Sequence, residues 1–523
     1  MPTPRLYEGR VRETRPRAAR VIAKRAGTFR VCRVSEATTP SDSPPAWVAD
    51  AVFYQIFPER FARSHQLRKP GNLEEWDSPP TRHGYKGGDL VGVVERLDWL
   101  TELGINSIYL NPIFRSASNH RYHTHDYYQV DPLLGGNEAF RTLLDACHER
   151  GIRVILDGVF NHASRGFFQF NDILENGYGS PWVDWFTITG SPLNPYHQEL
   201  PPNYQAWWGN PALPKFNTDH PDVREYLMGV AEHWTRQGID GWRLDVPSEI
   251  TTPGFWEEFR SRVRAINPQA YLVGEIWADA TDWIARGDRF DAAMNYIFTG
   301  KTLAFVAGHR IDAGLAEGVD YPVKPAIDAG QYGDEIEWLL SRYPEQTTRS
   351  NLNLLGSHDT ARSLTMAGGD VDSVVLAALL MFTFPGAPCV YYGDEIGMTG
   401  GKDPESRGAF PWDRPESWNT RILEAYRRLS ALRHAHPALR HGSYRRLSSQ
   451  TGSSLYMFLR ETPEERLLIA VNANEEAASA SIREPYPGRQ FETLWGTGGI
   501  KTDGHWMSMA LPPRCGVVWR VEH

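Results

Sequence analysis

Two charged residues stand two positions apart in a segment that otherwise has the character of a β-strand. The stretch "GWRLDV" (241–246) is short and mostly apolar, yet it contains Arg243 and Asp245. Residues i and i+2 of a strand point to the same face, so these two side chains share one side. Burying a charge costs several kcal/mol unless it is paired. The two residues therefore form either a structural ion pair or part of a cavity in which the charge is used.

Carboxylates also follow other apolar, strand-like segments. Asp157 follows "IRVIL", Glu275 follows "AYLVG", and Asp359 ends the tripeptide "SHD". A convergent group of carboxylates has three common uses: a metal site, a proton-abstraction site, or a pair for glycoside cleavage. Arg243 argues against Asp245 as a primary metal ligand, because it would already hold that carboxylate ionised. An ionised carboxylate near a second one that can hold a proton is what glycosyl transfer needs.

The order of elements along the chain predicts how these residues come together. Apolar strand candidates alternate with helical periodicity or long loops, and such alternation predicts an α/β fold with a parallel sheet. Eight units predict a (β/α)8 TIM barrel, in which polar residues at the carboxyl ends of strands line the active site. The expected strands span 51–57, 105–113, 152–160, 239–246, 270–277, 289–296, 349–359 and 387–395, with helices at 90–104, 137–151, 223–238, 253–268 and 371–386.

Breaks in this alternation predict the domain organisation. Residues 1–46, rich in Arg and then in Ser, Thr and Pro, are expected to be a poorly ordered extension with at most one short strand. The barrel is expected to comprise 47–161 and 218–437. Residues 162–217 are aromatic-rich and too long for an ordinary connection, which predicts a small domain inserted after the third strand. Short β-like runs in 438–523 predict a C-terminal antiparallel β-sandwich.

Composition excludes several function classes. The net charge is −9, which gives no indication of a nucleic-acid surface. No run approaches the 18 or so apolar residues of a membrane span, and no apolar signal-peptide segment follows the Arg-rich start. The four cysteines are far apart, which fits neither a zinc site nor a disulfide framework and favours a reducing, cytoplasmic location.

The sequence resembles the α-amylase family of glycoside hydrolases from residue 47 onward. The family's motifs match, in order and at barrel spacing, "DGVFNH" (157–162), "GWRLD" (241–245), "GEIW" (274–277), "GSHD" (356–359) and "GAPCVYYGDE" (386–395). The resemblance implies that Asp245 is the nucleophile and Glu275 the general acid/base. It also implies that Asp359 is the third carboxylate, which binds sugar hydroxyls and stabilises the transition state.

The resemblance further implies a set of substrate-binding residues and one metal position. His120 and Tyr122 match the family's H-x-Y pair, in which the Tyr forms the floor under the −1 sugar. Asn161 matches a position that binds structural calcium in many members, although a hydrogen-bonded Asn is the alternative; the chemistry itself needs no cofactor. The predicted substrate-binding residues are His120, Tyr122, Asp157, His162, Arg243, Glu249, Trp277 and His358.

Within the family, the chain looks like the neopullulanase, cyclomaltodextrinase and maltogenic amylase branch. "LPKFN" (213–217), Ser357, Glu249 and the +1 aromatic Trp277 carry this similarity. Two features of the sequence differ from the usual pattern of this branch. "VPSE" (246–249) replaces the branch's more usual Val-Ala-Asn-Glu, and the 46 residues before the first barrel motif are too few for the branch's N-terminal β-sandwich.

The expected function is that of a retaining hydrolase of α-1,4-glucosidic bonds. Its expected partners are α-glucan oligosaccharides: cyclodextrins, maltooligosaccharides and starch-like glucans, with pullulan and transglycosylation as further activities of the branch. The alternatives are an α-amylase that prefers starch, a transglycosylase or isomerase of the same family, and a non-catalytic sugar-binding homologue. No nucleic-acid or membrane partner is expected, and the oligomeric state is a monomer or a homodimer.

Overall fold

The fold is known from a computed structural model that describes residues 43–522, apart from a few short segments. The segments left out are 198, 318–322, 324–325, 448–454, 484–485, 487–488 and 504–505. The expected N-terminal extension, including the short strand at 28–34, therefore lies almost entirely outside the described residues. Of that extension, only the first residue of a short 3-10 helix, Ala46–Asp50, and the three residues before it are described.

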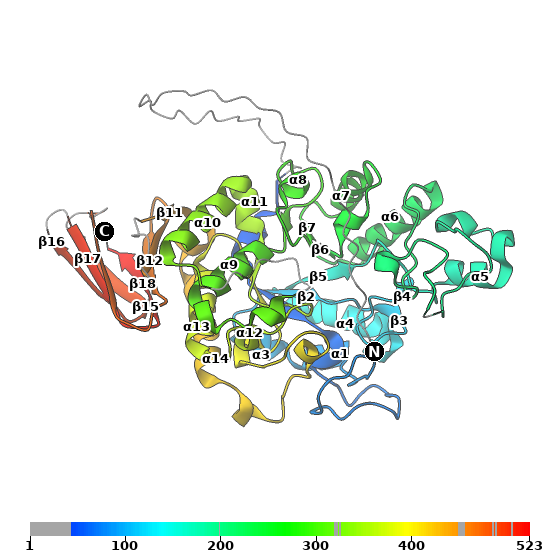
Figure 1. The fold of residues 1–523 in the computed structure, drawn as a ribbon, viewed down its shortest axis with the longest axis horizontal. Coiled ribbons are helices and arrows are strands. Elements are labelled where there is room, and N and C mark those ends of the chain that lie inside the picture. The colour runs from blue at the N-terminus through cyan, green and yellow to red at the C-terminus, as the bar shows by residue number, and fades with distance from the viewer. Residues whose placement is uncertain are drawn as a thin grey trace, which may run out of the picture. The chain divides into compact units, whose positions relative to one another are not determined.

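Eight parallel strands form the central sheet (Figure 1), which confirms the predicted (β/α)8 fold. Their order is β8-β7-β6-β5-β2-β1-β10-β9, and a parallel bridge between Met294 and Leu352 closes β8 onto β9. The strands are β1 (Phe53–Ile56), β2 (Ser107–Leu110), β5 (Arg153–Gly158), β6 (Gly241–Leu244), β7 (Tyr271–Gly274), β8 (Ala292–Ala293), β9 (Leu352–Leu354) and β10 (Ala387–Tyr391).

The register of three neighbouring strands sets the positions of the charged residues. Asp157 on β5 pairs with Arg243 on β6, and Leu244 on β6 pairs with Gly274 on β7. Asp245 and Glu275 each follow the paired residue directly. Because all three strands are parallel, these side chains emerge at the same, carboxyl end of the barrel.

Helices surround the sheet, largely where the periodicity predicts them. The expected single helix at 90–104 is an exception, because Arg96 leaves helical geometry and stacks its guanidinium on Trp412 at 4.3 Å. The described α-helices of the barrel are α1 (Pro58–Phe61), α2 (Leu90–Glu95), α3 (Leu97–Glu102), α4 (Gly136–Glu149), α6 (Pro221–Arg236), α7 (Phe255–Ile266), α8 (Thr281–Ile284), α9 (Tyr296–Val306), α10 (Ala329–Arg342), α11 (Glu345–Ser350), α12 (Ser363–Met366), α13 (Val371–Thr383) and α14 (Thr420–Ala435).

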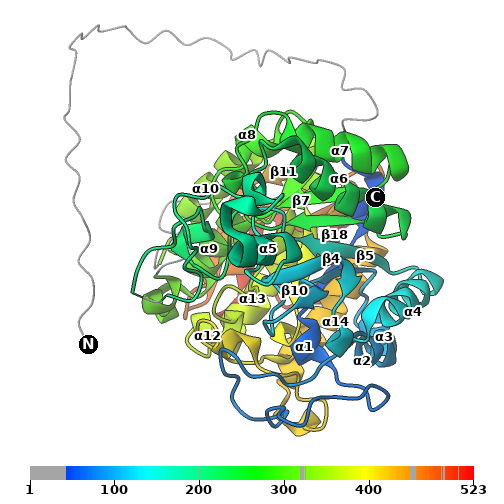
Figure 2. The same ribbon diagram turned by 90° about the vertical axis from the view of Figure 1, so that its right-hand side faces the viewer.

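The described part of the segment inserted after β5 contains the α-helix α5 (Phe168–Asn176), three short 3-10 helices (Gly177–Gly179, Val183–Trp185 and Trp207–Gly209), turns and isolated β-bridges. Figure 2 looks onto the side of the barrel that carries α5. The segment's own core is aromatic, and these rings are part of the same core as the barrel: Phe167, Phe170, Trp185, Phe186, Tyr204 and Phe216. A separate two-stranded sheet, β3 (Phe114–Ser116) with β4 (Thr124–Val130), precedes the segment in the sequence.

The C-terminal region consists of two antiparallel sheets with a core of their own. Alternating side chains such as Leu455, Met457, Met507 and Met509 fill the space between them. The five-stranded sheet contains β11 (Ser443–Arg446), β12 (Leu455–Glu461), β13 (Arg466–Asn472), β18 (Cys515–Val521) and β15 (Phe491–Gly496), and the three-stranded sheet contains β14 (Ala478–Arg483), β17 (Trp506–Leu511) and β16 (Gly499–Asp503). Among the described residues, no helix has both the length and the apolar character needed to cross a membrane.

A single buried arginine joins the end of the barrel to the segment that leads into these sheets. Arg433 on α14 is fully buried and donates four hydrogen bonds, all to backbone carbonyls. Its acceptors are Phe382 (3.1 Å), Leu439 (3.0 Å) on α15 (Pro437–His441), Ala49 (3.1 Å) and Gly386 (2.6 Å). Arg433 therefore satisfies carbonyl groups at the end of α13, before β10, in the first 3-10 helix and in α15.

We expect Arg433→Met to destabilise the protein strongly. Methionine fills similar space but leaves four buried carbonyls without a donor, and each such loss costs about 1–3 kcal/mol. Calorimetry should show a fall of several degrees in Tm. The matched control is Arg421→Met on the same helix, where the side chain is 62% exposed. An equal change in both variants would contradict the role of Arg433.

Candidate active site

The guanidinium of Arg243 lies between three carboxylates at the barrel mouth. It contacts Asp157 at 2.8 Å, Asp245 at 3.1 Å and Glu275 at 2.9 Å. Arg243 is fully buried, and Asp245 and Glu275 are only 7% and 5% exposed. The ion pair suggested by the sequence is thus one part of a larger cluster. Because Asp245 and Glu275 are held by the two terminal nitrogens of one guanidinium, their carboxyl groups face the same small space.

Asp157 supports this cluster from below. Its oxygens accept hydrogen bonds from Tyr109 (2.7 Å), Tyr122 (2.8 Å) and Arg243, and its side chain is completely buried. Asp157 therefore orients Arg243 and Tyr122. The substrate contact expected of Asp157 stays a prediction.

The third predicted carboxylate, Asp359, sits at the edge of the same site. It is paired with the neighbouring His358 at 3.0 Å and with Arg407 at 3.2 Å, and its side chain is 31% exposed. Arg407 also donates to the His358 carbonyl at 2.9 Å. Two basic groups thus fix the orientation of Asp359 and leave it accessible from the barrel mouth.

Tyr122 and His358 form a flat floor beside these carboxylates. Their rings stack with an interplanar angle of 7°, and the Tyr122 hydroxyl lies 2.6 Å from His358 Nε2. On the other side of the His358 ring, Nδ1 lies 2.8 Å from the side-chain amide of Gln55 on β1. Hydrogen bonds on both ring nitrogens hold the imidazole in one plane.

His120 and His162 both lie against Tyr122. His120 Nδ1 accepts from the Tyr122 backbone N–H at 3.2 Å, and the two rings are 5.8 Å apart. His162 is buried against the backbone of Tyr122 and stacks on Trp207. Burial lowers the pKa of His162 to about 3, so this imidazole is neutral at ordinary pH.

Asn161 has an unusual environment for a buried amide. Its Nδ2 lies 3.2 Å from His162 Nδ1, but its Oδ1 has no hydrogen-bond partner among the described residues. A buried acceptor of this kind suits a hard cation such as calcium, which prefers oxygen ligands. However, no group of three or more His, Cys, Asp and Glu side chains in the described part of the chain could hold a metal ion. The calcium expectation at Asn161 stays a prediction.

Trp277 and Val246 both fix the Glu275 carboxyl. The Trp277 indole N–H donates to Oε1 at 3.1 Å, and its ring stacks on Tyr296 with a centroid separation of 3.7 Å. The backbone N–H of Val246 donates to Oε2 at 3.0 Å. Val246 has φ = 34°, which a β-branched residue rarely adopts, so the chain is strained at the residue that follows Asp245.

Glu249 lies farther out and pairs with the "LPKFN" motif. Lys215 of that motif contacts the Glu249 carboxylate at 3.3 Å and its backbone carbonyl at 2.7 Å. Glu249 and the "LPKFN" motif, which the sequence connected only through their resemblance to the same branch, are therefore in contact. The pair ties the inserted segment to the loop that follows β6.

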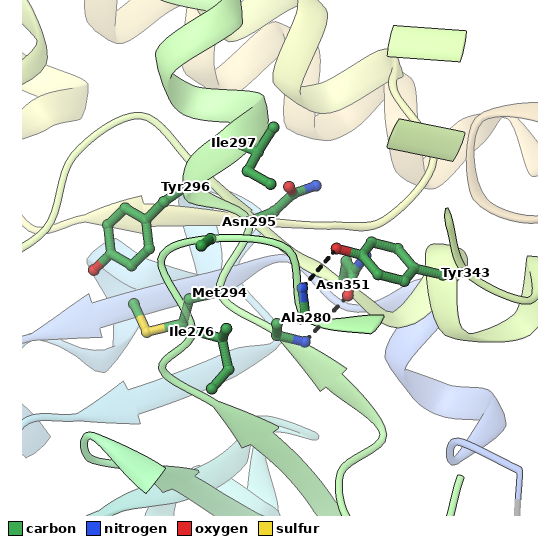
Figure 3. Close-up of a pocket in the computed structure, with 10 residues that line it drawn as sticks. Ile276, Ala280, Met294, Asn295, Tyr296, Ile297, Tyr343 and Asn351 are labelled. Carbon is green, nitrogen blue, oxygen red and sulfur yellow. Dashed lines mark hydrogen bonds between the residues drawn. The ribbon is translucent and has the colours of Figure 1, made fainter. Parts of the chain in front are cut away.

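A small pocket lies behind the loop that carries Glu275 (Figure 3). It is lined by residues from this loop and from the β8–α9 region, among them Ile276, Met294 and Tyr296. The Met294 sulfur lies 3.5 Å from Arg243 Nε. On another wall, the Tyr343 hydroxyl accepts a hydrogen bond from the Ala280 backbone N–H at 3.2 Å. Asp245, Glu275 and Asp359 are not among the residues that line this pocket, most of which are apolar.

The three carboxylates differ in the direction in which their surroundings shift their pKa values. Burial raises the pKa of both Asp245 and Glu275, and the positive charge of Arg243 opposes this rise. Burial also disfavours ionisation of Asp359, but His358, Arg407 and Arg243 outweigh it and hold the pKa of that carboxyl below its usual range. Burial thus favours the protonated form of Asp245 and Glu275, whereas the basic groups around Asp359 favour its ionised form.

Several residues of this site were not predicted from the sequence. Gln55 on β1 and Tyr109 on β2 are polar residues on the inner face of the barrel. That position was the sequence signal that could have identified them. Tyr296 is the first residue of the buried helix α9 and looks like an ordinary core residue. Arg407 ends a short 3-10 helix, Glu405–Arg407, far along the chain, and nothing in its local sequence indicates contact with Asp359.

Comparison with known proteins agrees with this geometry. Residues 55–420 match the family described as "Alpha amylase, catalytic domain", and residues 444–519 match "Maltogenic Amylase, C-terminal domain". The chain therefore belongs to the α-amylase family of glycoside hydrolases, as the motifs predicted.

Individual relatives show which members of the family the chain is similar to. The chain is 43% identical over 480 residues to a cyclomaltodextrinase from Geobacillus thermopakistaniensis, covering 91% of this chain and 78% of that protein. It is 41% identical over 447 residues to neopullulanase 2 from Thermoactinomyces vulgaris, covering 85% and 73%. The native structure of a debranching enzyme from Nostoc punctiforme superimposes with a TM-score of 0.85 at 54% identity, covering 91% of this chain and 99% of that one.

Replacing Arg243 should change how stability depends on pH. Folded-state carboxyl pKa values above the unfolded values of about 4 favour folding at low pH, and this contribution is lost as pH rises through the folded pKa. Arg243→Met removes the charge that opposes the rise in Asp245 and Glu275. We therefore expect the variant to lose more stability at pH 8 than at pH 5, by at least about 1.4 kcal/mol, together with its activity.

Tm measured by calorimetry at the two pH values tests this expectation. The control is Arg262→Met, because Arg262 pairs with carboxylates on the surface. A loss in Arg243→Met that is the same at pH 5 and pH 8 would show that the guanidinium does not set the charge of the two carboxyls.

Proposed function

We propose that this chain is a retaining glycoside hydrolase that cleaves α-1,4-glucosidic bonds in cyclodextrins and maltooligosaccharides. The observation that carries the proposal is the single guanidinium of Arg243 between Asp245 and Glu275. Two carboxyls that share one guanidinium are close, as in retaining enzymes, where they lie about 5 Å apart. Inverting enzymes separate the two carboxyls by roughly 6.5–9.5 Å to admit a water molecule.

In the proposed mechanism, Asp245 attacks the anomeric carbon while Glu275 protonates the departing glycosidic oxygen. The C1–O bond breaks as the bond from C1 to the Asp245 carboxylate forms, giving a covalent glycosyl-enzyme. Glu275, now ionised, then takes a proton from water, whose oxygen attacks C1 and releases Asp245. The hydrogen bonds from Val246 and Trp277 keep the Glu275 carboxyl in position for both steps.

The surrounding residues have binding roles in this proposal. Tyr122 and His358 provide the flat surface beside the reacting sugar. Asp359, ionised and partly exposed, accepts hydrogen bonds from sugar hydroxyls, which stabilises the transition state. His120 and His162 border the same sugar, and Trp277 and Glu249 lie toward the departing part of the substrate.

A reducing compartment is the proposed location. The three cysteines in the described part of the chain, Cys147, Cys389 and Cys515, are all free. Proteins that work in oxidising environments more often use such residues in disulfides. The oligomeric state, monomer or homodimer, stays a prediction.

The nucleophile can be tested by charge removal. Asp245→Asn keeps the shape of the side chain but removes the attacking charge, so hydrolysis should fall by about 1,000-fold or more. Binding of β-cyclodextrin, measured by calorimetry, should persist. The control is Asp98→Asn, where the side chain is 84% exposed on the surface. In the wild type, proton NMR should show the α-anomer in the first minutes; an initial β-anomer would refute the retaining mechanism.

The substrate can be tested by comparing kcat/KM on four glucans. We expect values on β-cyclodextrin and maltooligosaccharides to exceed those on starch by roughly 5–30-fold, or about 1–2 kcal/mol of transition-state discrimination. The Lys215–Glu249 contact supports this direction, because it places the inserted segment against the loop beyond the catalytic pair. A preference for starch would favour the open-cleft α-amylase alternative.

Pullulan is the fourth substrate because of the similarity to a debranching enzyme. Products separated by chromatography distinguish cleavage of α-1,6 from α-1,4 bonds. Free glucose and maltose accumulate only with hydrolysis, whereas longer products indicate the transglycosylase alternative.

A further inference from the structure

Three aromatic rings are stacked from the candidate active site to the surface of the inserted segment. The His162 and Trp207 rings are 5.2 Å apart with an interplanar angle of 18°, and Trp207 and Trp208 are 4.8 Å apart at 16°. His162 is buried, Trp207 is half-buried, and Trp208 is 79% exposed. The stack therefore passes from the site to the solvent in two steps.

The backbone of Trp208 is strained. Its φ of 49° and ψ of 30° lie in the left-handed region, which costs a residue with a bulky side chain about 1–2 kcal/mol. The flanking turn is well defined, since Trp207 N–H donates to the Leu213 carbonyl at 3.0 Å and Leu213 N–H donates to the Asn210 carbonyl at 3.0 Å. Glycine or asparagine would suit this backbone better, so the tryptophan is placed there in spite of the conformation.

The stack also contains an indole nitrogen without an acceptor. Within the described residues, Trp207 Nε1 is buried and has no hydrogen-bond partner. A buried indole N–H usually finds an acceptor, because leaving it unsatisfied costs about 1–3 kcal/mol. A hydroxyl group of a bound sugar chain would satisfy this nitrogen.

Exposure of an aromatic ring alone does not make Trp208 unusual. Phe168 and Tyr178 on the same inserted segment are 66% and 64% exposed. Among the exposed aromatic residues described in this segment, however, only Trp208 stacks on a ring that is itself stacked on a candidate active-site residue.

We propose that Trp208 is a specificity-determining residue whose open ring face stacks on a distal glucose unit of a long α-glucan chain. The apolar face of a sugar ring matches an indole in size and flatness, and Trp207 Nε1 donates to a hydroxyl of the same chain. Only a chain that extends past the sugar beside His162 reaches Trp208, so the contact favours long substrates. This inference rests on the proposed hydrolysis of α-glucans.

Trp208→Gly tests the contact without harming the fold, because glycine adopts positive φ freely. Removing a contact made equally in the ground and transition states raises KM and leaves kcat unchanged. We expect KM for maltoheptaose to rise about 3–10-fold, the loss of one aromatic contact, while kcat/KM for maltotriose changes by less than about twofold. Trp208→Phe, which keeps a ring, should retain most of the maltoheptaose affinity.

The matched control is Trp506→Ala on β17, an exposed tryptophan (58%) of the C-terminal sheets. Calorimetric binding of maltoheptaose to Asp245→Asn, with and without Trp208→Gly, gives a readout that does not depend on turnover. Equal effects of Trp208→Gly on maltotriose and maltoheptaose, or no effect on either, would overturn the inference and leave the proposed function intact. A wild type that hydrolyses neither sugar would overturn the proposed function, and the inference with it.

Discussion

The fully buried positive charge of Arg243 is the constraint on which the rest of the site depends. Three carboxylates, Asp157, Asp245 and Glu275, lie within 3.1 Å of it in the buried interior of the barrel mouth. An unpaired buried charge costs several kcal/mol, so neither the cation nor the carboxylates could occupy this place without the others. The cluster also explains the division of roles. Asp157 is completely buried and orients Arg243 and Tyr122, whereas Asp245 and Glu275 are held by Arg243 and keep a small exposed surface.

The regular backbone of the parallel sheet is enough to bring this cluster together. A register that pairs Asp157 with Arg243, and Leu244 with Gly274, brings the charged residues of three strands to one level. The strain occurs where the strand ends. Val246 takes a left-handed conformation directly after Asp245, and its N–H is thereby directed at Glu275. Strain of this kind persists only where the surrounding structure holds it, and the buried ion cluster is what holds it here.

Much of this arrangement could be predicted from the sequence, because parallel strands and their terminal carboxylates leave a strong local pattern. The eight strands, the convergence of Asp245, Glu275 and Asp359, and the antiparallel C-terminal sheets all follow from periodicity and motifs. What could not be predicted depends on contacts between distant parts of the chain. Arg407 reaches Asp359 from a short 3-10 helix, Glu405–Arg407, and Arg96, at the break between α2 and α3, stacks on Trp412, a ring more than 300 residues away. The contacts of Asp157 with Arg243 and Tyr122 could not be predicted for another reason: a motif indicates that a residue matters, but not which neighbouring side chains it holds.

The residues proposed to carry out the reaction and those proposed to set substrate specificity stand on parts of the fold that are held in place differently. The reacting carboxylates stand on strands whose positions are fixed by hydrogen-bonded neighbours on both sides, so their geometry tolerates little variation. The inserted segment has isolated bridges in place of a sheet, and its aromatic core continues that of the barrel. Its inner rings are therefore held rigidly, while its outer turn around Trp208 is held by only a few backbone hydrogen bonds. A turn of this kind can change its exposed residues without disturbing Arg243 or its partners. Discrimination between substrates is thus free to vary in the segment, while the cluster at the strand ends keeps the reaction the same.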